Sequence, residues 1–251
     1  MNVLIALLAI ITGYLIGSIS FARLVTRLFA PQQDITRIAL EVPGSNATFE
    51  SGAISATSVR LHLGPKYGCL TGALDILKAT VPALAFKLWQ PDAPYYLLAA
   101  AMAPVGHIWP IYHRFKGGRG MSPIMGGMLV VDWLAVVVTN VLGLLSDLAI
   151  KSTLVSSGVW LILMIPWLWL RRHDWPELVY AAAMCALFWL SMMPEWRELA
   201  RLQREGVLEN LQHAGEVRVL SRLDRGTARQ ISTSDLLSAL VARLKRKDGE
   251  P

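Results

Sequence analysis

The sequence predicts an all-α polytopic membrane protein with about seven transmembrane helices and a cytoplasmic C-terminal tail. Two features of its composition indicate this class. Of the 251 residues, 54% are hydrophobic and only 17% are charged, against about 45–50% and about 25% in soluble domains. The third feature is distribution, because residues 1–193 carry nearly all of the apolar excess. We therefore divide the chain into a transmembrane domain at 1–193 and a charged tail at 194–251.

Apolar runs of membrane-spanning character follow one another along the first domain. A spanning helix needs about 20 apolar residues, so the run at 121–149, interrupted at Asp132-Trp133, is too long for one helix. The first run lacks the positive start and cleavage site of a signal peptide, and we interpret it as a retained span. Dividing the long run gives seven segments, at 2–20, 69–89, 95–111, 121–131, 133–149, 153–170 and 177–193.

The distribution of Lys and Arg predicts the orientation, because cytoplasmic loops favour these residues. An external N-terminus places the basic segments 21–68 and 112–120, the turn at Lys151 and the tail inside. Arg171-Arg172 then lie outside, against the rule. A six-span count would place them inside but would put the basic tail outside, and we prefer seven spans.

Charge and cysteine content limit the partners. A net charge of +6 fits loops that face anionic lipid better than a nucleic-acid surface. Cys69 and Cys185 form no pair or Cys/His cluster, so we expect neither a disulfide framework nor a metal site. In the tail, residues 233–247 predict an amphipathic helix, which suits a membrane surface or a contact with the rest of the protein.

The glycine-rich basic loop at 106–120 carries the strongest functional signal. Glycines let backbone N–H groups approach an oxyanion, and two flanking cations add positive charge. His107, at the start of the loop, has the chemistry of a general base, although a lone histidine near a helix end is more often structural. The candidates for a phosphate clamp are Lys116, Gly117, Gly118 and Arg119.

Three further polar groups fall on the same predicted membrane face. The hydroxyl-rich run 51–58, followed by Arg60, suits phosphate oxygens or is an ordinary polar loop. Asp75 and Lys78 stand three residues apart within an apolar run, where they support the site or simply pair with each other. The segment 151–157 contains serine and threonine hydroxyls that also satisfy backbone carbonyls in membrane helices.

These motifs together resemble the PlsY-type glycerol-3-phosphate acyltransferases of bacteria, over about residues 1–205. Gly106 to Gly120 is similar to that family's GHxFPxxxxFKGGKG almost position for position. Weaker likenesses are Gly17–Ala22 to GSIPxA, Ser51–Ser58 to SGNxGATN, Leu74–Lys78 to LDxxKG, and Lys151–Ser156 to the third family motif.

The resemblance implies an inner-membrane enzyme with its site at the cytoplasmic face. Such an enzyme transfers a fatty acyl group from acyl phosphate to the sn-1 hydroxyl of glycerol 3-phosphate, giving lysophosphatidic acid and phosphate without acyl-CoA, carrier protein or cofactor. The implied catalytic residues are His107, Ser51 and Lys116. The implied phosphate-binding residues are Ser51, Gly52, Arg60, Lys116, Gly117, Gly118, Arg119, Thr153 and Ser156, with Asp75, Lys78 and Ser152 in support.

Several positions depart from the family pattern. Ala53 replaces an asparagine, and Arg60 stands one place before the family's arginine. Glu195 and Glu198 occupy the places of a histidine and an asparagine, and negative charge beside a phosphate site weakens anion binding. Two alternatives therefore stay open, namely an acyltransferase with another acceptor or donor, and a non-catalytic paralogue that binds lipid or phosphate.

Overall fold

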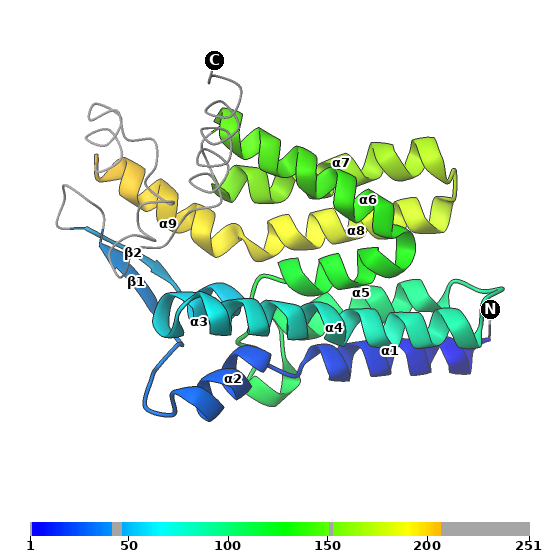
Figure 1. Ribbon diagram of the computed structural model, residues 1–251, viewed down its shortest axis with the longest axis horizontal. Helices are drawn as coiled ribbons and strands as arrows, with labels where there is room; N and C mark the ends of the chain where they lie inside the picture. The colour runs from blue at the N-terminus through cyan, green and yellow to red at the C-terminus, as the bar shows by residue number, and fades with distance from the viewer. Residues whose placement is uncertain (1, 42–46, 151–152, 207–251) are drawn as a thin grey trace, which may run out of the picture.

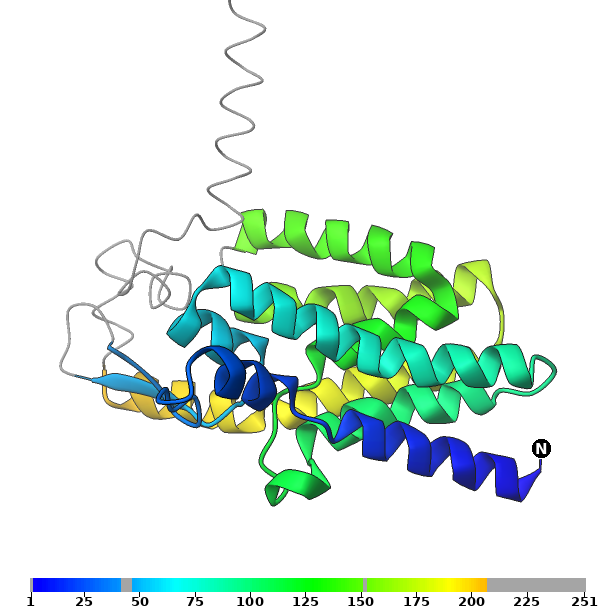
Figure 2. The same ribbon diagram turned by 60° about the horizontal axis from the view of Figure 1, so that its bottom comes forward.

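The computed structural model describes residues 2–41, 47–150 and 153–206, and long apolar helices form its main body (Figure 1). They run side by side along one axis, as the turned view in Figure 2 also shows. The helices and strands are α1 (Val3–Gly17), α2 (Phe21–Phe29), β1 (Ile38–Glu41), β2 (Thr48–Ser51), α3 (Ala56–Leu63), α4 (Pro65–Trp89), α5 (Tyr95–Ile108), the 3₁₀ turn η1 (Ile111–His113), α6 (Met121–Ile150), α7 (Thr153–Arg171), α8 (Trp175–Ser191) and α9 (Met193–Arg204).

Helices α1 and α5 pack through small residues. Gly13 and Gly17 of α1 face Ala99 and Ala103 of α5, and a Cβ at either glycine would overlap backbone atoms of the alanine opposite. Close approach through small residues is a common way for helices to associate in lipid, where the hydrophobic effect does not drive them together. This contact sets the C-terminal end of α1 beside that of α5, where the glycine-rich loop begins.

Asp132 divides α6 into two helices, which confirms the division predicted within 121–149. Its backbone is not helical (φ −151°, ψ 98°). Its Oδ1 accepts hydrogen bonds from the backbone N–H groups of Leu134 at 3.0 Å and Ala135 at 3.1 Å, as a helix N-cap does. The chain turns back here, so α6 begins and ends at the same end of the bundle (Figure 1).

The predicted class of multi-pass helical membrane protein is confirmed, and the number seven stays a prediction. Among the described residues, three helical stretches are long and apolar enough to cross a membrane by length and composition, although Asp132 breaks the third, and the bent pair of α8 and α9 would add a fourth. Helix α5 has only 14 residues, whereas α7 has 19. The three long stretches are Val3–Phe29, Pro65–Trp89 and Met121–Ser146.

The two arginines that did not fit the charge rule lie at the end of the bundle away from the glycine-rich loop, and both have carboxylate partners. Arg171 Nε lies 3.3 Å from Asp132 Oδ2. Arg172 donates to Glu177 at 2.9 and 2.7 Å, and this fully buried carboxylate also accepts from Tyr96 at 2.8 Å. Neutralised charges of this kind weaken the conflict between Arg171-Arg172 and the predicted orientation, which stays a prediction.

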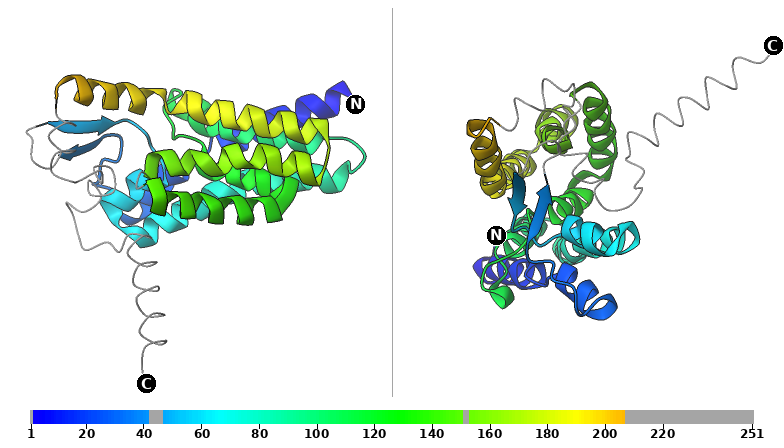
Figure 3. Two further views of the ribbon diagram at one scale, coloured as in Figure 1. Left: turned by 90° about the horizontal axis from the view of Figure 1, so that it is seen from above. Right: turned by 90° about the vertical axis from the view of Figure 1, so that its left-hand side faces the viewer.

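The short elements gather at the opposite end of the bundle (Figures 1 and 3). Strands β1 and β2 pair antiparallel with Ile38 opposite Ser51, a hairpin that we had expected to be a polar loop. It lies between α9 and α3 when seen along the bundle (Figure 3). Helix α9, which the sequence assigned to the tail, thereby joins this end of the molecule. The amphipathic helix predicted at 233–247 lies outside the described residues.

Candidate active site

The glycine-rich loop is fastened to two neighbouring segments by backbone hydrogen bonds. The N–H of Gly118 donates to the carbonyl of His107 at 3.1 Å, and the N–H of Ile54 donates to the carbonyl of Gly117 at 3.0 Å. The first bond folds the loop back on the end of α5. The second connects the loop to the segment that follows Ser51. Two motifs about 65 residues apart in the chain therefore meet here.

Glycine is required at both central positions of the loop. A Cβ at Gly117 would overlap the carbonyl oxygen of His107, and a Cβ at Gly118 would overlap the His107 Nε2 atom. The loop reaches this position through Arg114 and Phe115, which adopt the left-handed backbone conformation (φ 52° and 59°). The pair Gly117-Gly118 is thus a packing requirement of the loop, in addition to any role in binding an anion.

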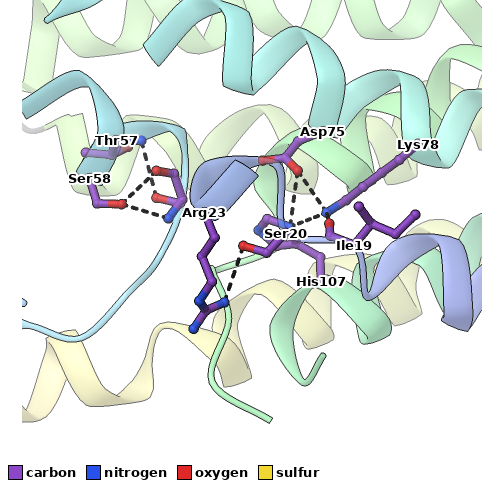
Figure 4. A network of polar contacts seen from close by, with 9 residues as sticks. Ile19, Ser20, Arg23, Thr57, Ser58, Asp75, Lys78 and His107 are labelled. Carbon is purple, nitrogen blue, oxygen red and sulfur yellow. Dashed lines mark hydrogen bonds and ion pairs between the residues drawn. The ribbon is translucent and has the colours of Figure 1, made fainter. Parts of the chain in front are cut away.

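A buried ionic cluster of Asp75, Lys78 and His107 lies next to the loop (Figure 4). Lys78 Nζ lies 2.8 Å from Asp75 Oδ1 and donates to the carbonyl of Ile19 at 2.8 Å. It also lies 2.8 Å from Nδ1 of His107, and because an ammonium group can only donate, that nitrogen accepts. All three side chains are buried. The Asp–Lys pairing considered from the sequence is therefore present, and it includes His107.

The hydroxyls of the run 51–58 divide into two groups. Ser55 and Ser58 form a capping box at the start of α3, in which the Ser55 side chain accepts from the N–H of Thr57 at 3.3 Å and Ser58 bonds the backbone of Ser55 (Figure 4). These hydroxyls satisfy helix N-terminal groups. Ser51 is different, because its side chain points to another helix.

Ser51, Arg119 and Glu195 meet at the junction of β2, the glycine-rich loop and α9. Ser51 Oγ donates to Glu195 Oε1 at 2.8 Å, and Arg119 donates to the same oxygen through Nε at 2.7 Å and through Nη2. Glu195 is only 6% exposed. Two predicted phosphate-binding residues, Ser51 and Arg119, thus converge on one point, and the carboxylate of Glu195 occupies it.

Two contacts of the loop were not predicted from the sequence. Arg23 of α2 donates to the carbonyl of Lys116 at 2.8 Å, and Ser191, the last residue of α8, donates to the carbonyl of Arg119 at 2.9 Å. Arg23 directly follows the Gly17–Ala22 motif in the sequence, and this position could have indicated that it lies near the site. Burial, and then the charge of Arg23, lowers the pKa of His113, so the loop draws its positive charge from lysine and arginine.

The remaining predicted residues are less closely tied to this junction. The Lys116 side chain is exposed, and nothing stands within 4 Å of a Cβ placed at Gly52. Arg60 lies on the face of α3 that packs against Gly68 of α4. Ser152 lies outside the described residues, as do the side chains of Thr153 and Ser156. The residues that the structure describes contain no group of three or more side chains suited to holding a metal ion.

Known proteins share this architecture. A family profile described as glycerol-3-phosphate acyltransferase matches residues 7–204. A glycerol-3-phosphate acyltransferase of Rhodopseudomonas palustris (strain BisB5) is 32% identical over 72% of this chain and 86% of its own length. One from Bradyrhizobium diazoefficiens is 33% identical over 72% and 85%.

Two solved structures are also similar. Both are crystal structures of PlsY, an integral membrane glycerol 3-phosphate acyltransferase, in its glycerol 3-phosphate and lysophosphatidic acid forms. The TM-scores are 0.65 and 0.64, with 27% identity over 80% of this chain and 93% of that one.

The fold and the family match define an integral-membrane acyltransferase of phospholipid synthesis built on a helical bundle. The chain belongs to the PlsY-type glycerol-3-phosphate acyltransferase family, whose reaction yields lysophosphatidic acid. The predicted family, the enzyme class and the formation of lysophosphatidic acid are confirmed.

Proposed function

We propose that the acyl donor is an acyl phosphate and that Ser51, Arg119 and Lys116 bind phosphate oxygens beside the backbone N–H of Gly117. Gly118, whose N–H is bonded to the His107 carbonyl, shapes the loop at this site. The convergence of Ser51 and Arg119 on a single oxygen carries this assignment, because two residues 68 positions apart present donors to one point. Convergent donors of this kind stabilise charge that develops on a leaving group. The Lys116 side chain is exposed to solvent, so its ammonium group can contact a substrate as it enters the site.

The reaction needs no covalent intermediate on the protein. The sn-1 hydroxyl oxygen of glycerol 3-phosphate attacks the carbonyl carbon of the acyl phosphate, and the bond from that carbon to the phosphate oxygen breaks. The hydroxyl proton leaves with inorganic phosphate, which is a weak base and a good leaving group. The protein then has to hold the two substrates in contact and offset the negative charge of the phosphate.

We assign His107 a positioning role. Its Nδ1 accepts from Lys78, its side chain is buried, and its Nε2 lies against Gly118. A buried imidazole whose Nδ1 is bonded to Lys78 and whose ring lies beneath Gly118 is placed to shape the loop. Asp75 and Lys78 support it in the same role. Thr153, Ser156, Ser152, Gly52 and Arg60 stay proposed members of the binding site on the family likeness.

An assay of purified protein tests the donor and the clamp together. We expect radiolabelled glycerol 3-phosphate to give lysophosphatidic acid with palmitoyl phosphate and none with palmitoyl-CoA. Lys116→Ala is expected to reduce kcat/KM by about 100-fold, the usual cost of one transition-state donor. Turnover with palmitoyl-CoA alone, or a Lys116→Ala enzyme equal to the wild type, would contradict the proposal.

We further propose that this end of the bundle faces the cytoplasm, because it carries the basic loop 112–120. A single cysteine introduced as Tyr112→Cys, in a chain without the two native cysteines, is expected to react with an impermeant maleimide in inverted inner-membrane vesicles. The matched variant Pro91→Cys, at the opposite end, is expected to react from the periplasmic side only. The reverse pattern would show the opposite orientation.

A further inference from the structure

The contacts around Glu195 have the geometry of an occupied anion site. Three donor groups, the Ser51 hydroxyl and the Nε and Nη2 groups of Arg119, point to Glu195 Oε1. The N–H of Ala53 donates to Ser51 Oγ at 3.3 Å, which leaves the Ser51 proton for the carboxylate. A carboxylate oxygen and a non-bridging phosphate oxygen make the same demand on such donors, since both are anionic acceptors.

The second carboxylate oxygen of Glu195 receives none of these donors. Glu195 Oε2 is buried and has no hydrogen-bond partner among the described residues. A buried acceptor without a partner costs free energy. The carboxylate is therefore held through one oxygen only, and an anion that brought its own hydroxyl, or that used the donors more fully, would be a better occupant.

Glu195 can leave this position without dismantling the loop. It lies in the first turn of α9, and the axes of α8 and α9 differ by 43° at their junction. The loop is held separately, because Ser191 bonds the Arg119 carbonyl and Ile54 bonds the Gly117 carbonyl. A change in the side-chain torsions of Glu195, or a small movement of α9, would thus free Ser51 and Arg119 in place.

We propose that Glu195 is a specificity-determining residue that competes with the phosphate of a substrate for Ser51 and Arg119. The inference rests on the proposed assignment of these two residues to phosphate. Any phosphate monoester that enters must displace the carboxylate, so Glu195 raises the KM for that substrate and leaves the chemical step unchanged. Glycerol 3-phosphate and acyl phosphate share this chemistry, and separate KM values for each identify which one uses the junction.

The test compares Glu195→Gln with Glu198→Gln. Both remove one negative charge from α9, but Glu198 contacts Arg201 and the N–H of Glu50 and does not contact Arg119. For Glu195→Gln we expect the KM of one substrate to fall about tenfold, the value of one charge-assisted hydrogen bond, with kcat within about twofold of the wild type. Inorganic phosphate should inhibit at correspondingly lower concentration. Glu198→Gln should match the wild type.

A second background separates this inference from the proposed function. Arg119→Gln is expected to raise the same KM, and adding Glu195→Gln to it should then have little further effect, because the two residues act through one contact. If Arg119→Gln leaves both KM values unchanged, the phosphate assignment and the inference both fail. If Arg119→Gln raises KM but Glu195→Gln does not lower it, the assignment stands and the competition is refuted.

Glu195→Asn serves as an independent neutral variant should the glutamine protein fail to fold, which its thermal unfolding would show. An unchanged or higher KM in the folded neutral variant would mean that Glu195 holds the donors in position and does not compete with the substrate.

Discussion

The two charged clusters at the site end of the bundle differ in burial and in the contacts of their carboxylate oxygens. Asp75, Lys78 and His107 are buried together and contact one another (Figure 4). In the second cluster, Arg119 is partly exposed, and Glu195 keeps one oxygen without a partner in the described part of the chain. Asp75 Oδ1 also lacks a hydrogen-bond partner among the residues that the structure describes, but Lys78 Nζ lies 2.8 Å from it. We therefore expect the first cluster to be fixed, whereas the proposed competition would let the second exchange one anion for another.

The largest effect is expected from Lys78→Met. This change leaves Asp75 buried without its cation, and breaking a buried pair from one side costs about 3–5 kcal/mol. We expect loss of the folded protein, measured by thermal unfolding in detergent. The double variant Asp75→Asn/Lys78→Met removes both charges and should recover much of the stability. If Lys78→Met were as stable as the wild type, the buried Asp75–Lys78 pair would not be required for the folded state.

Gly118→Ala should separate the loop from the histidine beneath it. Its Cβ would overlap His107 Nε2 and crowd the carbonyl of Ile54, and overpacking of this kind costs about 1–3 kcal/mol. We expect a large loss of kcat/KM, because the displaced loop carries Arg119. The folded protein should persist, as thermal unfolding would show. Gly72→Ala in α4 is the matched control, because its Cβ has only an ordinary contact with Ala56 at 3.6 Å. Equal activity of the two variants would contradict a shaped loop.

Arg172→Gln tests a buried carboxylate far from the site. It removes two hydrogen bonds from Glu177 and should lower the free energy of unfolding by about 1–2 kcal/mol, because the Arg172 side chain is 38% exposed and solvent screens it. Both KM values should stay at their wild-type levels. A changed KM would mean that the two ends of the bundle are coupled.

The smallest effect is expected from Arg201→Gln. This residue contacts Glu198 and the carbonyl of Thr48 on the outside of α9, and its side chain is half exposed. Exposed ion pairs of this type contribute at most about 1 kcal/mol. Unfolding and kinetic measurements should both lie near the wild type. A large loss of activity would instead indicate that α9 is held in place by this outer contact.

Much of the fold could be predicted because it depends on patterns among residues that are close together in the sequence. The apolar runs predicted the long helices, and the interruption at Asp132 predicted the turn within α6, since an aspartate can cap the second helix through its own side chain. The hairpin at Ile38–Ser51 was missed, because its segment reads as polar loop and its pairing depends on a partner strand. The closeness of Ser51 and Arg119 was predicted only through the shared membrane face.

The membrane class and the family could be predicted from the chain alone, because hydrophobic run length and a contiguous glycine-rich motif are properties of neighbouring positions. Which of the candidate site residues meet depends on the three-dimensional packing of the helices. Glu195 was visible as an unusual charge, but its place between Ser51 and Arg119 depends on the path of α8 and α9 across the bundle. Contacts between residues 144 and 76 positions apart arise from packing, and no local pattern in the chain encodes them.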